Sequence, residues 1–473
     1  MIQIDYIPTR RMAKLVTDED TMSFIRNHFS VKNEGAFFAK KKGHRFVKDR
    51  KYAITPSGLF QFGMYVEIVK FLVKSQITDI KYTDNFKTYL KCGFGEFEIV
   101  NNLIHEERYY QGDGLKAALT KGRGIIEHGT GAGKSLLQAL LIDNFIRLSG
   151  KDNFKCLLIV PGTSLVAQLH SDFSEYGVSF SHSMWSGKNP LQDTTVVICN
   201  TENLTAKFNN SPWIKDVDLA VVDECHGVNT DANLEKWLSK IHTPNKYGFT
   251  GTLSDKVEDQ WKAFGMFGGV IHQKKSKELR DEGYLTNVSV KIIKFIHTSK
   301  PPSNEIKGYL KEMEYIYNHE GRNDTIRKLS NNIKGNQLIM VNHLLQGDNL
   351  RDKLKDNTND LFYITGEMPV SERFGVIKKM EESDNNTTIS MSKIFSTGIN
   401  IKNLPNIMLV GLGKGFIRLV QTIGRGLRLH DNKEKLTIID VYDNMKYSER
   451  HMEKRKEIYE KESISWKEVE INI

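Results

Sequence analysis

The strongest constraint in this sequence is the stretch His128–Ser135, in which glycines alternate with other residues and a Lys-Ser pair follows. The residues before it, Gly124–Glu127, form a short apolar run that predicts a buried strand. The residues after it, Leu136–Ile142, predict the first turns of a buried helix. A strand, a glycine-rich loop, Lys-Ser and a helix, in this order, are typical of a phosphate-binding loop.

Such a loop binds phosphate because its backbone curls until several N–H groups point at one anion. The N-terminus of the following helix adds partial positive charge, and Lys134 adds a full charge. Ser135 offers a hydroxyl to a phosphate-bound Mg²⁺. The loop residues expected to contact the nucleotide are Gly129, Thr130, Gly131, Ala132 and Gly133. The strict motif has glycine where this chain has His128, so the match is to a looser form, and an ordinary glycine-rich turn is the alternative.

A second signal stands at the end of the apolar run Leu219–Val222, which is followed by Asp223-Glu224-Cys225-His226. Ligands of open α/β sheets bind at the carboxyl ends of strands. Hydrolysis of ATP needs one carboxylate to hold Mg²⁺ and another to orient the attacking water. We assign the first role to Asp223 and the second to Glu224, with ATP and Mg²⁺ as the expected cofactors.

From about residue 100 the sequence alternates between apolar runs and helical spacing. Continuous apolar runs are typical of strands buried on both faces of a parallel sheet. In the first half they are Cys156–Val160, Thr195–Cys199 and Leu219–Val222. After a break at Lys300–Ser303 they are Gln337–Val341, Leu361–Ile364, Asn406–Val410 and Leu436–Asp440. The sequence therefore predicts an α/β fold with two parallel-sheet domains in tandem, ending from Tyr447 in one exposed helix and a loose end.

With these motifs in this order, residues 105 to 445 resemble superfamily 2 helicases and translocases, whose two parallel-sheet domains are RecA-like. Arg108 and Gln111 resemble the family's adenine-reading motif, and Thr250, Thr252 and His226 resemble the residues that couple hydrolysis to the nucleic-acid grip. The family's nucleic-acid backbone contacts match Pro161, Gln168, Thr201, Thr397 and Gly398. The family's last motif matches Gln421, Arg425 and Arg428.

The resemblance implies that Arg425 and Arg428 reach the γ-phosphate from the second domain. Arginine fingers of this kind contribute on the order of 10³–10⁵ in rate. Because these arginines belong to the other domain, closure of the cleft would depend on the bound nucleotide. Each cycle could then shift one domain's grip on the strand relative to the other's.

Residues 1–95 precede the helicase motifs and are expected to form a small α/β (α+β) domain, followed by RecA-like domains over 96–288 and 289–473. Aromatic and basic residues are interleaved between Phe37 and Ile54, and Lys40, Lys41, Lys42 and Arg45 are candidate contacts to a phosphate backbone. The alternative is a solvated lysine-rich loop. Gly58–Gly63 with the helix after it resembles the accessory domain of UvsW-type helicases of T-even phages, which remodel forks, junctions and R-loops.

Composition limits the expected partners and cellular location of the protein. The net charge of +9 over 473 residues favours a polyanionic partner. No run of about 18 apolar residues appears, so no membrane partner is expected. The four cysteines are not spaced as zinc ligands, so no structural metal is expected and a reduced cytoplasm fits. We expect a monomer in the cytoplasm, that of a bacterial host if the chain is phage-encoded.

The sequence thus predicts an ATP-dependent helicase that unwinds and branch-migrates branched DNA, with DNA forks or junctions as its partner. Three alternatives remain. An RNA helicase with an Asp-Glu-Cys-His box would share nearly every motif. A nucleic-acid-binding protein with a vestigial ATPase is a second, although Lys134, Asp223 and Glu224 are all present. A restriction-type translocase is a third, but no nuclease-like cluster of acidic residues and lysine stands out.

Overall fold

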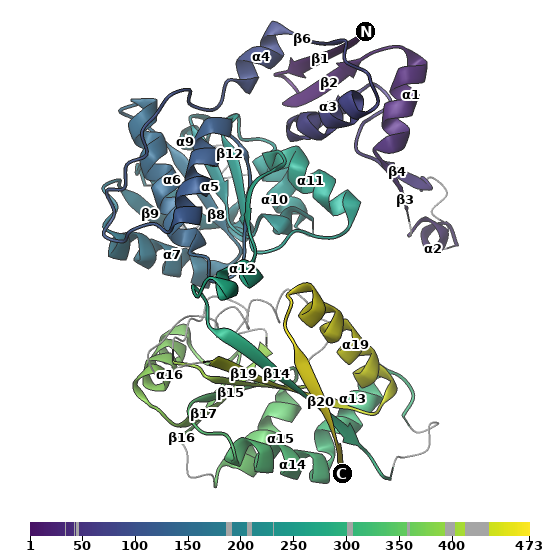
Figure 1. Cartoon of the computed structure of the whole chain (residues 1–473), viewed down its shortest axis with the longest axis vertical. Coiled ribbons are helices and arrows are strands. Elements are labelled where there is room, and N and C mark those ends of the chain that lie inside the picture. Colours follow the sequence, from purple (N-terminus) through teal and green to yellow (C-terminus); the bar gives the residue numbers. More distant parts are fainter. Residues whose placement is uncertain are drawn as a thin grey trace. The chain divides into compact units, whose positions relative to one another are not determined.

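The computed structural model describes residues 1–33, 35–41, 43, 47–185, 192–205, 211–229, 231–299, 306–356, 360–392, 403–411 and 435–473. These residues divide into two compact units. The first holds Met1–Gly129 and Gly133–Lys275, and the second holds Ser276–Ile473. Each unit contains a seven-stranded sheet of its own (Figure 1).

The first unit begins with a small accessory domain built on a four-stranded sheet in the order β5-β2-β1-β6. Its strands are β1 (Ile2–Ile7), β2 (Met12–Val16), β5 (Leu59–Phe60) and β6 (Ile80–Tyr82), and its helices are α1 (Glu19–His28), α3 (Tyr65–Lys74) and α4 (Asp84–Leu90). A separate hairpin pairs β3 (Ser30–Lys32) with β4 (Arg50–Tyr52) and carries α2 (Ala36–Lys41) between them. Alternate residues Ile2, Ile4 and Tyr6 of β1 are buried against the helices, which gives this domain its own core.

The accessory domain packs closely on α11 (Val257–Phe267) of the same unit. A Cβ built on Gly63 would lie 2.0 Å from the carbonyl oxygen of Phe264 and 2.6 Å from the nitrogen of Gly268, so the two backbones touch. Arg123 extends this contact, since its guanidinium lies 4.8 Å from the centre of the Phe62 ring. The same guanidinium donates to the carbonyl oxygens of Met266 and Phe267. Glycine is required at position 63 because any side chain would push the domains apart.

Replacing Gly63 with alanine is therefore expected to loosen the accessory domain. Overpacking of this kind typically costs about 1–3 kcal/mol. We expect faster proteolysis and faster amide hydrogen exchange in residues 1–90 and in α11. Gly95→Ala serves as a control, because a Cβ there meets nothing within 4 Å and the backbone is not in the left-handed region. Equal exchange rates in the two variants would contradict the close-contact account.

The remainder of the first unit is a seven-stranded parallel sheet in the order β13-β7-β12-β11-β8-β10-β9. Its strands are β7 (Gly124–His128), β8 (Cys156–Val160), β9 (His182–Trp185), β10 (Val196–Asn200), β11 (Leu219–Val222), β12 (Lys246–Thr250) and β13 (Val270–Lys274). Its helices include α5 (Tyr109–Lys121), α6 (Lys134–Ser149), α7 (Thr163–Tyr176), α9 (Pro212–Lys215), α10 (Ala232–Leu238) and α11.

The apolar runs are continuous because both faces of this sheet are covered. In β7, Ile126 joins the core formed with α5, α6 and α7, whereas its neighbour Ile125 joins the core formed with α10 and α11. Leu158 and Leu157 of β8 divide in the same way. Successive side chains of a strand point to opposite faces, so a strand buried on both sides must be apolar at every position.

The second unit is built on another seven-stranded parallel sheet, in the order β16-β17-β15-β18-β19-β14-β20. Its strands are β14 (Asn287–Ile296), β15 (Gln337–Val341), β16 (Asp360–Ile364), β17 (Asn386–Met391), β18 (Asn406–Val410), β19 (Lys435–Asp443) and β20 (Trp466–Asn472). Its helices include α12 (Ser276–Asp281), α13 (Tyr309–Asn318), α14 (Glu320–Asn331), α15 (Leu344–Leu354), α16 (Val370–Glu382) and α19 (Lys446–Lys461). The expected fold class, two parallel-sheet α/β domains with a small N-terminal domain, is confirmed.

The end of the chain differs from the sequence-based expectation of an exposed helix and a loose end. Trp466–Asn472 form β20, which pairs in parallel with β14 and closes one edge of the second sheet. The helix α19 is only partly exposed, because Met452 and Tyr459 are fully buried. Most exposed positions of this edge strand are charged, namely Lys467, Glu468 and Glu470, so it lacks the continuous apolar run that reveals the inner strands. Among the helices described, none is both long enough and apolar enough to traverse a bilayer.

Candidate nucleotide-binding site

The glycine-rich loop leaves the carboxyl end of β7 and enters α6 at Lys134. Gly131 and Gly133 have φ of 86° and 74°, a left-handed conformation that glycine adopts without strain. A Cβ on Gly133 would lie 2.5 Å from Nε2 of Gln111, so a side chain at this position would displace that amide. Gln111 Nε2 donates to the carbonyl oxygen of Gly133 at 3.0 Å, and its Oε1 accepts from the nitrogen of Arg108 at 2.8 Å. The two predicted adenine-contacting residues are thus joined directly to the glycine-rich loop.

Lys134 and Ser135 stand at the first turn of α6, where the helix N-terminus favours an anion. The ammonium of Lys134 donates back to the carbonyl oxygen of His128 at 3.3 Å, across the mouth of the loop. Ser135 Oγ lies 2.8 Å from the hydroxyl of Tyr176, the last residue of α7. No sequence motif identifies Tyr176, because its proximity to Ser135 depends on how α7 packs on α6.

Asp223 and Glu224 follow β11 at the same carboxyl edge of the sheet. Nε2 of Gln138, one turn beyond Lys134 on α6, donates to Asp223 Oδ1 at 3.1 Å, which places the Asp223 carboxylate beside the glycine-rich loop. Burial, followed by the charge of Glu224, raises the pKa of Asp223 to about 6, against the opposing effect of Lys134. Sequence reasoning missed Gln138, although its position on the buried face of the predicted helix is a usable signal.

Glu224 is one of the few non-glycine residues with a left-handed backbone, at φ 49°. Its Oε2 lies 3.3 Å from Nδ1 of His226, and the same nitrogen lies 3.0 Å from Oγ1 of Thr250. Oγ1 of Thr250 in turn donates to the carbonyl oxygen of Thr252 at 3.1 Å. The structure thus brings Glu224 and the three predicted coupling residues into one chain of polar contacts.

The donor set at this edge fits a divalent cation held with a nucleotide. The Asp223 carboxylate and the Ser135 hydroxyl are oxygen ligands of the kind that Mg²⁺ prefers. Burial and the neighbouring Glu224 disfavour the negative charge of Asp223 and raise its pKa, and a bound cation would favour that charge. Within the described part of the chain, no cluster of three or more His, Cys, Asp or Glu side chains forms a separate metal site.

Two of the candidate nucleic-acid contacts of the first unit lie at the same edge. Pro161 follows β8 and Thr201 follows β10, and these strands are neighbours whose last residues, Val160 and Asn200, are paired in register. Gln168 lies farther along α7, on a partly exposed position. Lys40 and Lys41 are exposed at the end of α2, and Lys40 pairs with Asp49 at 2.7 Å. Seven predicted residues lie outside the described residues: Lys42, Arg45, Thr397, Gly398, Gln421, Arg425 and Arg428.

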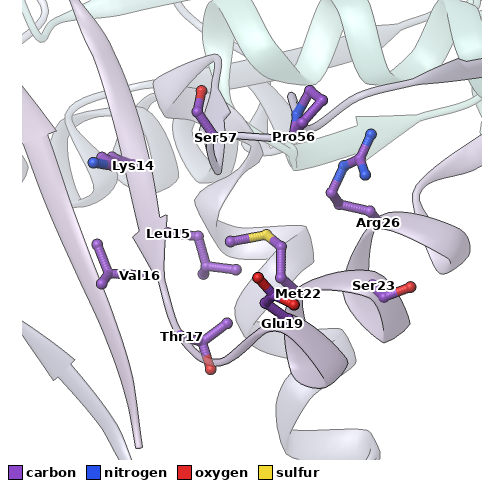
Figure 2. A pocket seen from close by; sticks show the side chains of 10 residues that line it. All are labelled: Lys14, Leu15, Val16, Thr17, Glu19, Met22, Ser23, Arg26, Pro56 and Ser57. Atoms are coloured by element: carbon purple, nitrogen blue, oxygen red, sulfur yellow. The ribbon is translucent and has the colours of Figure 1, made fainter.

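A hollow of about 400 Å³ in the accessory domain is separate from this site (Figure 2). It lies between β2, the first turns of α1 and the Pro56–Ser57 turn. Figure 2 shows the thioether of Met22 reaching toward Leu15 at its floor, with Arg26 beside Pro56 at the rim. Its lining mixes apolar, acidic and basic side chains, so no single ligand chemistry is indicated.

Comparison with known proteins agrees with this geometry. Residues 104–255 match the family model for the res subunit of type III restriction enzymes, and residues 321–430 match the model for the helicase conserved C-terminal domain. Together with the similarity to a phage DNA helicase given next, these matches define the class of enzyme, an ATP-dependent DNA helicase.

Among individual proteins, the chain is similar to the ATP-dependent DNA helicase uvsW of Enterobacteria phage T4. The two are 28% identical over 456 residues, which covers 90% of this chain and 88% of the relative. Two solved structures share the fold. One is a type ISP restriction-modification enzyme bound to DNA, with a TM-score of 0.59, 13% identity, and coverage of 84% of this chain and 34% of that chain. The other is Dbp5 of Saccharomyces cerevisiae bound to RNA and ADP BeF3, with a TM-score of 0.54, 15% identity, and coverage of 78% and 90%.

Proposed function

We propose that this protein is an ATP-dependent helicase that unwinds and branch-migrates branched DNA, including forks, Holliday junctions and R-loops, in phage replication, recombination or repair. The observation that carries the proposal is the similarity to the phage DNA helicase over 90% of the chain. Because residues 1–95 make up about a fifth of the sequence, that alignment has to include part of the accessory domain and not the two parallel-sheet domains alone.

In this proposal the nucleotide lies on the loop Gly129–Gly133 with Lys134 against its phosphates, and Arg108 and Gln111 beside its base. Asp223 and Ser135 would hold Mg²⁺, which supplies charge compensation on the phosphates when bound. Glu224 orients the attacking water and accepts its proton. Glu224 contacts His226, His226 contacts Thr250, and Thr250 contacts Thr252. These contacts transmit a change in the bound nucleotide from Glu224 to Thr252. Gln421, Arg425 and Arg428 keep the roles that the family resemblance assigns to them.

The nucleic-acid strand is proposed to contact Pro161, Gln168 and Thr201 in the first unit. Thr397 and Gly398, which lie outside the described residues, keep the contacts that the family resemblance assigns to them. The accessory domain adds contacts to a second DNA arm. We also infer that the protein acts as a monomer in the cytoplasm of a bacterial host, as suits a phage enzyme. Light scattering on the purified protein with and without a DNA fork tests the oligomeric state.

The function is tested by measuring ATP hydrolysis and strand separation on a panel of forks, four-way junctions, R-loops, plain duplexes and single-stranded RNA. We expect the greatest stimulation and unwinding with forks or four-way junctions. Equal or greater stimulation by single-stranded RNA would make the protein an RNA helicase instead. No hydrolysis with any nucleic acid would identify a binding protein with a vestigial ATPase.

The accessory domain's role gives a second test. Replacing Lys40 and Lys41 together with alanine should weaken fork binding and reduce the slope of log K against log salt by nearly 2, because each lost phosphate contact removes about 0.9 from that slope. The control replaces two exposed lysines of the second unit, Lys378 and Lys454, each of which lies in a surface ion pair as Lys40 does. A slope identical in all three proteins would mean that the lysine-rich segment is only a solvated loop.

A further inference from the structure

A buried histidine at the start of the glycine-rich loop, His128, is hydrogen-bonded to a partly buried one, His272. His128, the last residue of β7, is 0% exposed, and its Nε2 lies 2.7 Å from Nδ1 of His272 on β13. The two rings meet edge to face with centres 5.0 Å apart. The 2.7 Å between the two nitrogens is a hydrogen-bond distance, so one nitrogen carries a proton and the other accepts it.

The ring of His128 is neutral near pH 7. Burial first, then the charges of His272, Lys134 and Lys274, lower the pKa of His128 to about 3. Among the described residues, Nδ1 of His128 has no hydrogen-bond partner. A buried N–H without a partner is costlier than a buried acceptor, so we assign the proton to Nε2 of His128, which donates to His272. The bond therefore has a direction, from the strand that carries the loop to the neighbouring edge strand.

β13 contacts the loop and its surroundings at further points. The nitrogen of Gly129, the first residue of the loop, donates to the carbonyl oxygen of Lys274 at 2.9 Å. The ammonium of Lys274 donates to the hydroxyl of Tyr109 at 2.6 Å, beside the predicted adenine-contacting residues. Gln273 donates to Glu127 at 2.6 Å. The His128–His272 bond is the innermost of these contacts, because both rings also face Gly114 of α5, where a Cβ would lie 3.3–3.4 Å from them.

A fully buried polar side chain such as His128 costs free energy unless it is hydrogen-bonded, and His272 provides the bond. Hydrogen bonds fix distance and angle, whereas apolar contacts permit sliding. The carbonyl oxygen of His128 also accepts from the ammonium of Lys134, so a shift of His128 would move the partner of the residue expected to face the phosphates.

We propose that the His128–His272 hydrogen bond is a positioning device that holds the start of the phosphate-binding loop in the geometry that nucleotide requires. The proposal rests on the loop's proposed function as the ATP site. It assigns both histidines as positioning residues and not as catalytic ones, because neither is argued to touch the nucleotide. Loss of the bond should weaken ground-state and transition-state binding alike, which raises KM for ATP with little change in kcat.

The test compares His272→Leu with His272→Asn in the full-length protein, using a fluorescent ADP to measure the nucleotide Kd and steady-state ATP hydrolysis to obtain KM and kcat. Leucine fills the space without a polar atom, and asparagine places an amide oxygen near the position of Nδ1. We expect His272→Leu to raise Kd and KM about tenfold with kcat within about threefold of the parent, and His272→Asn to recover most of the loss. His182→Leu is the matched control, since His182 meets His170 with ring centres 4.6 Å apart in the same domain and has no contact with the loop among those described.

All measurements are made below the unfolding midpoint of the weakest variant, so that stability loss does not enter Kd. An unchanged Kd in His272→Leu would overturn the proposal, as would failure of His272→Asn to recover affinity. A fall in kcat at unchanged Kd would overturn it as well. Lys134→Ala is measured alongside: if that variant also binds nucleotide normally, the assignment of the loop as the ATP site fails, whereas a defect confined to Lys134→Ala removes only the histidine proposal.

Discussion

Replacing Glu224 with glutamine is expected to lower the kcat of DNA-stimulated ATP hydrolysis by about 10²–10⁴-fold, the usual contribution of a positioned general base. Glutamine keeps the size of the side chain but cannot accept a proton from water. The Glu224 carboxylate is oriented by Nδ1 of His226, 3.3 Å away, which in turn contacts Oγ1 of Thr250. ATP hydrolysis with a saturating DNA fork measures the effect.

Binding of the DNA fork should remain within a few-fold of the parent, because Glu224 is not among the proposed nucleic-acid contacts. Lys134→Ala should also abolish turnover, but through loss of charge at the phosphates and with weaker nucleotide binding. Glu235→Gln, on α10 of the same unit, is the matched control and should hydrolyse ATP at the parental rate. Undiminished hydrolysis in both Glu224→Gln and Lys134→Ala would remove the roles assigned to these residues.

Replacing Asp443 with asparagine is expected to destabilise the second unit by about 3–5 kcal/mol, the usual cost of leaving one member of a buried ion pair without its partner. Asp443, at the end of β19, and Arg322, in the first turn of α14, are both 0% exposed. Nε of Arg322 donates to both carboxylate oxygens, at 2.9 and 3.1 Å, and His297 Nε2 lies 2.9 Å from one of them. Thermal or urea unfolding followed in the second unit measures the loss.

The control is Asp352→Asn. The Asp352 carboxylate forms an exposed pair with Arg351 at 3.1 Å, so this change should alter stability by less than about 1 kcal/mol.

The network of Asp443, Arg322 and His297 also predicts that the second unit is sensitive to acid. Burial alone would raise the pKa of Asp443, but Arg322 and His297 lower it below its ordinary value. A carboxylate with a lowered folded-state pKa contributes stability above its unfolded pKa and loses that contribution as the pH falls through the folded pKa. Equal stability of the Asp443 and Asp352 variants would contradict the account.

The elements that sequence reasoning predicted best are those whose burial leaves a local pattern. β8, β11, β15 and β18 lie within a residue of the apolar runs that predicted them, because strands covered on both faces are apolar at every position. β20 escaped prediction because an edge strand exposes its side chains, so its sequence resembles a charged tail.

The residues of the candidate site also divide into those that a local pattern predicts and those that only tertiary packing brings together. Lys134, Ser135, Asp223 and Glu224 follow predicted strands, and parallel strands bring their carboxyl ends to one edge, so their meeting could be predicted from order along the chain. Tyr176, Gln138 and His272 contact these residues through packing between elements distant in sequence. No motif spacing encodes such contacts, because they depend on the angle and depth at which a helix or edge strand packs.

The sequence by itself determined the class of fold, the glycine-rich loop and the carboxylates beside it, since each follows from local backbone chemistry and from the periodicity of burial. Only the tertiary structure decided which side chains support that loop. It also decided that position 63 must be glycine where the accessory domain meets α11, and that Trp466–Asn472 form a strand of the second sheet. The physical reason is that burial patterns record whether a residue faces a core, whereas contacts between distant segments arise only when the segments pack.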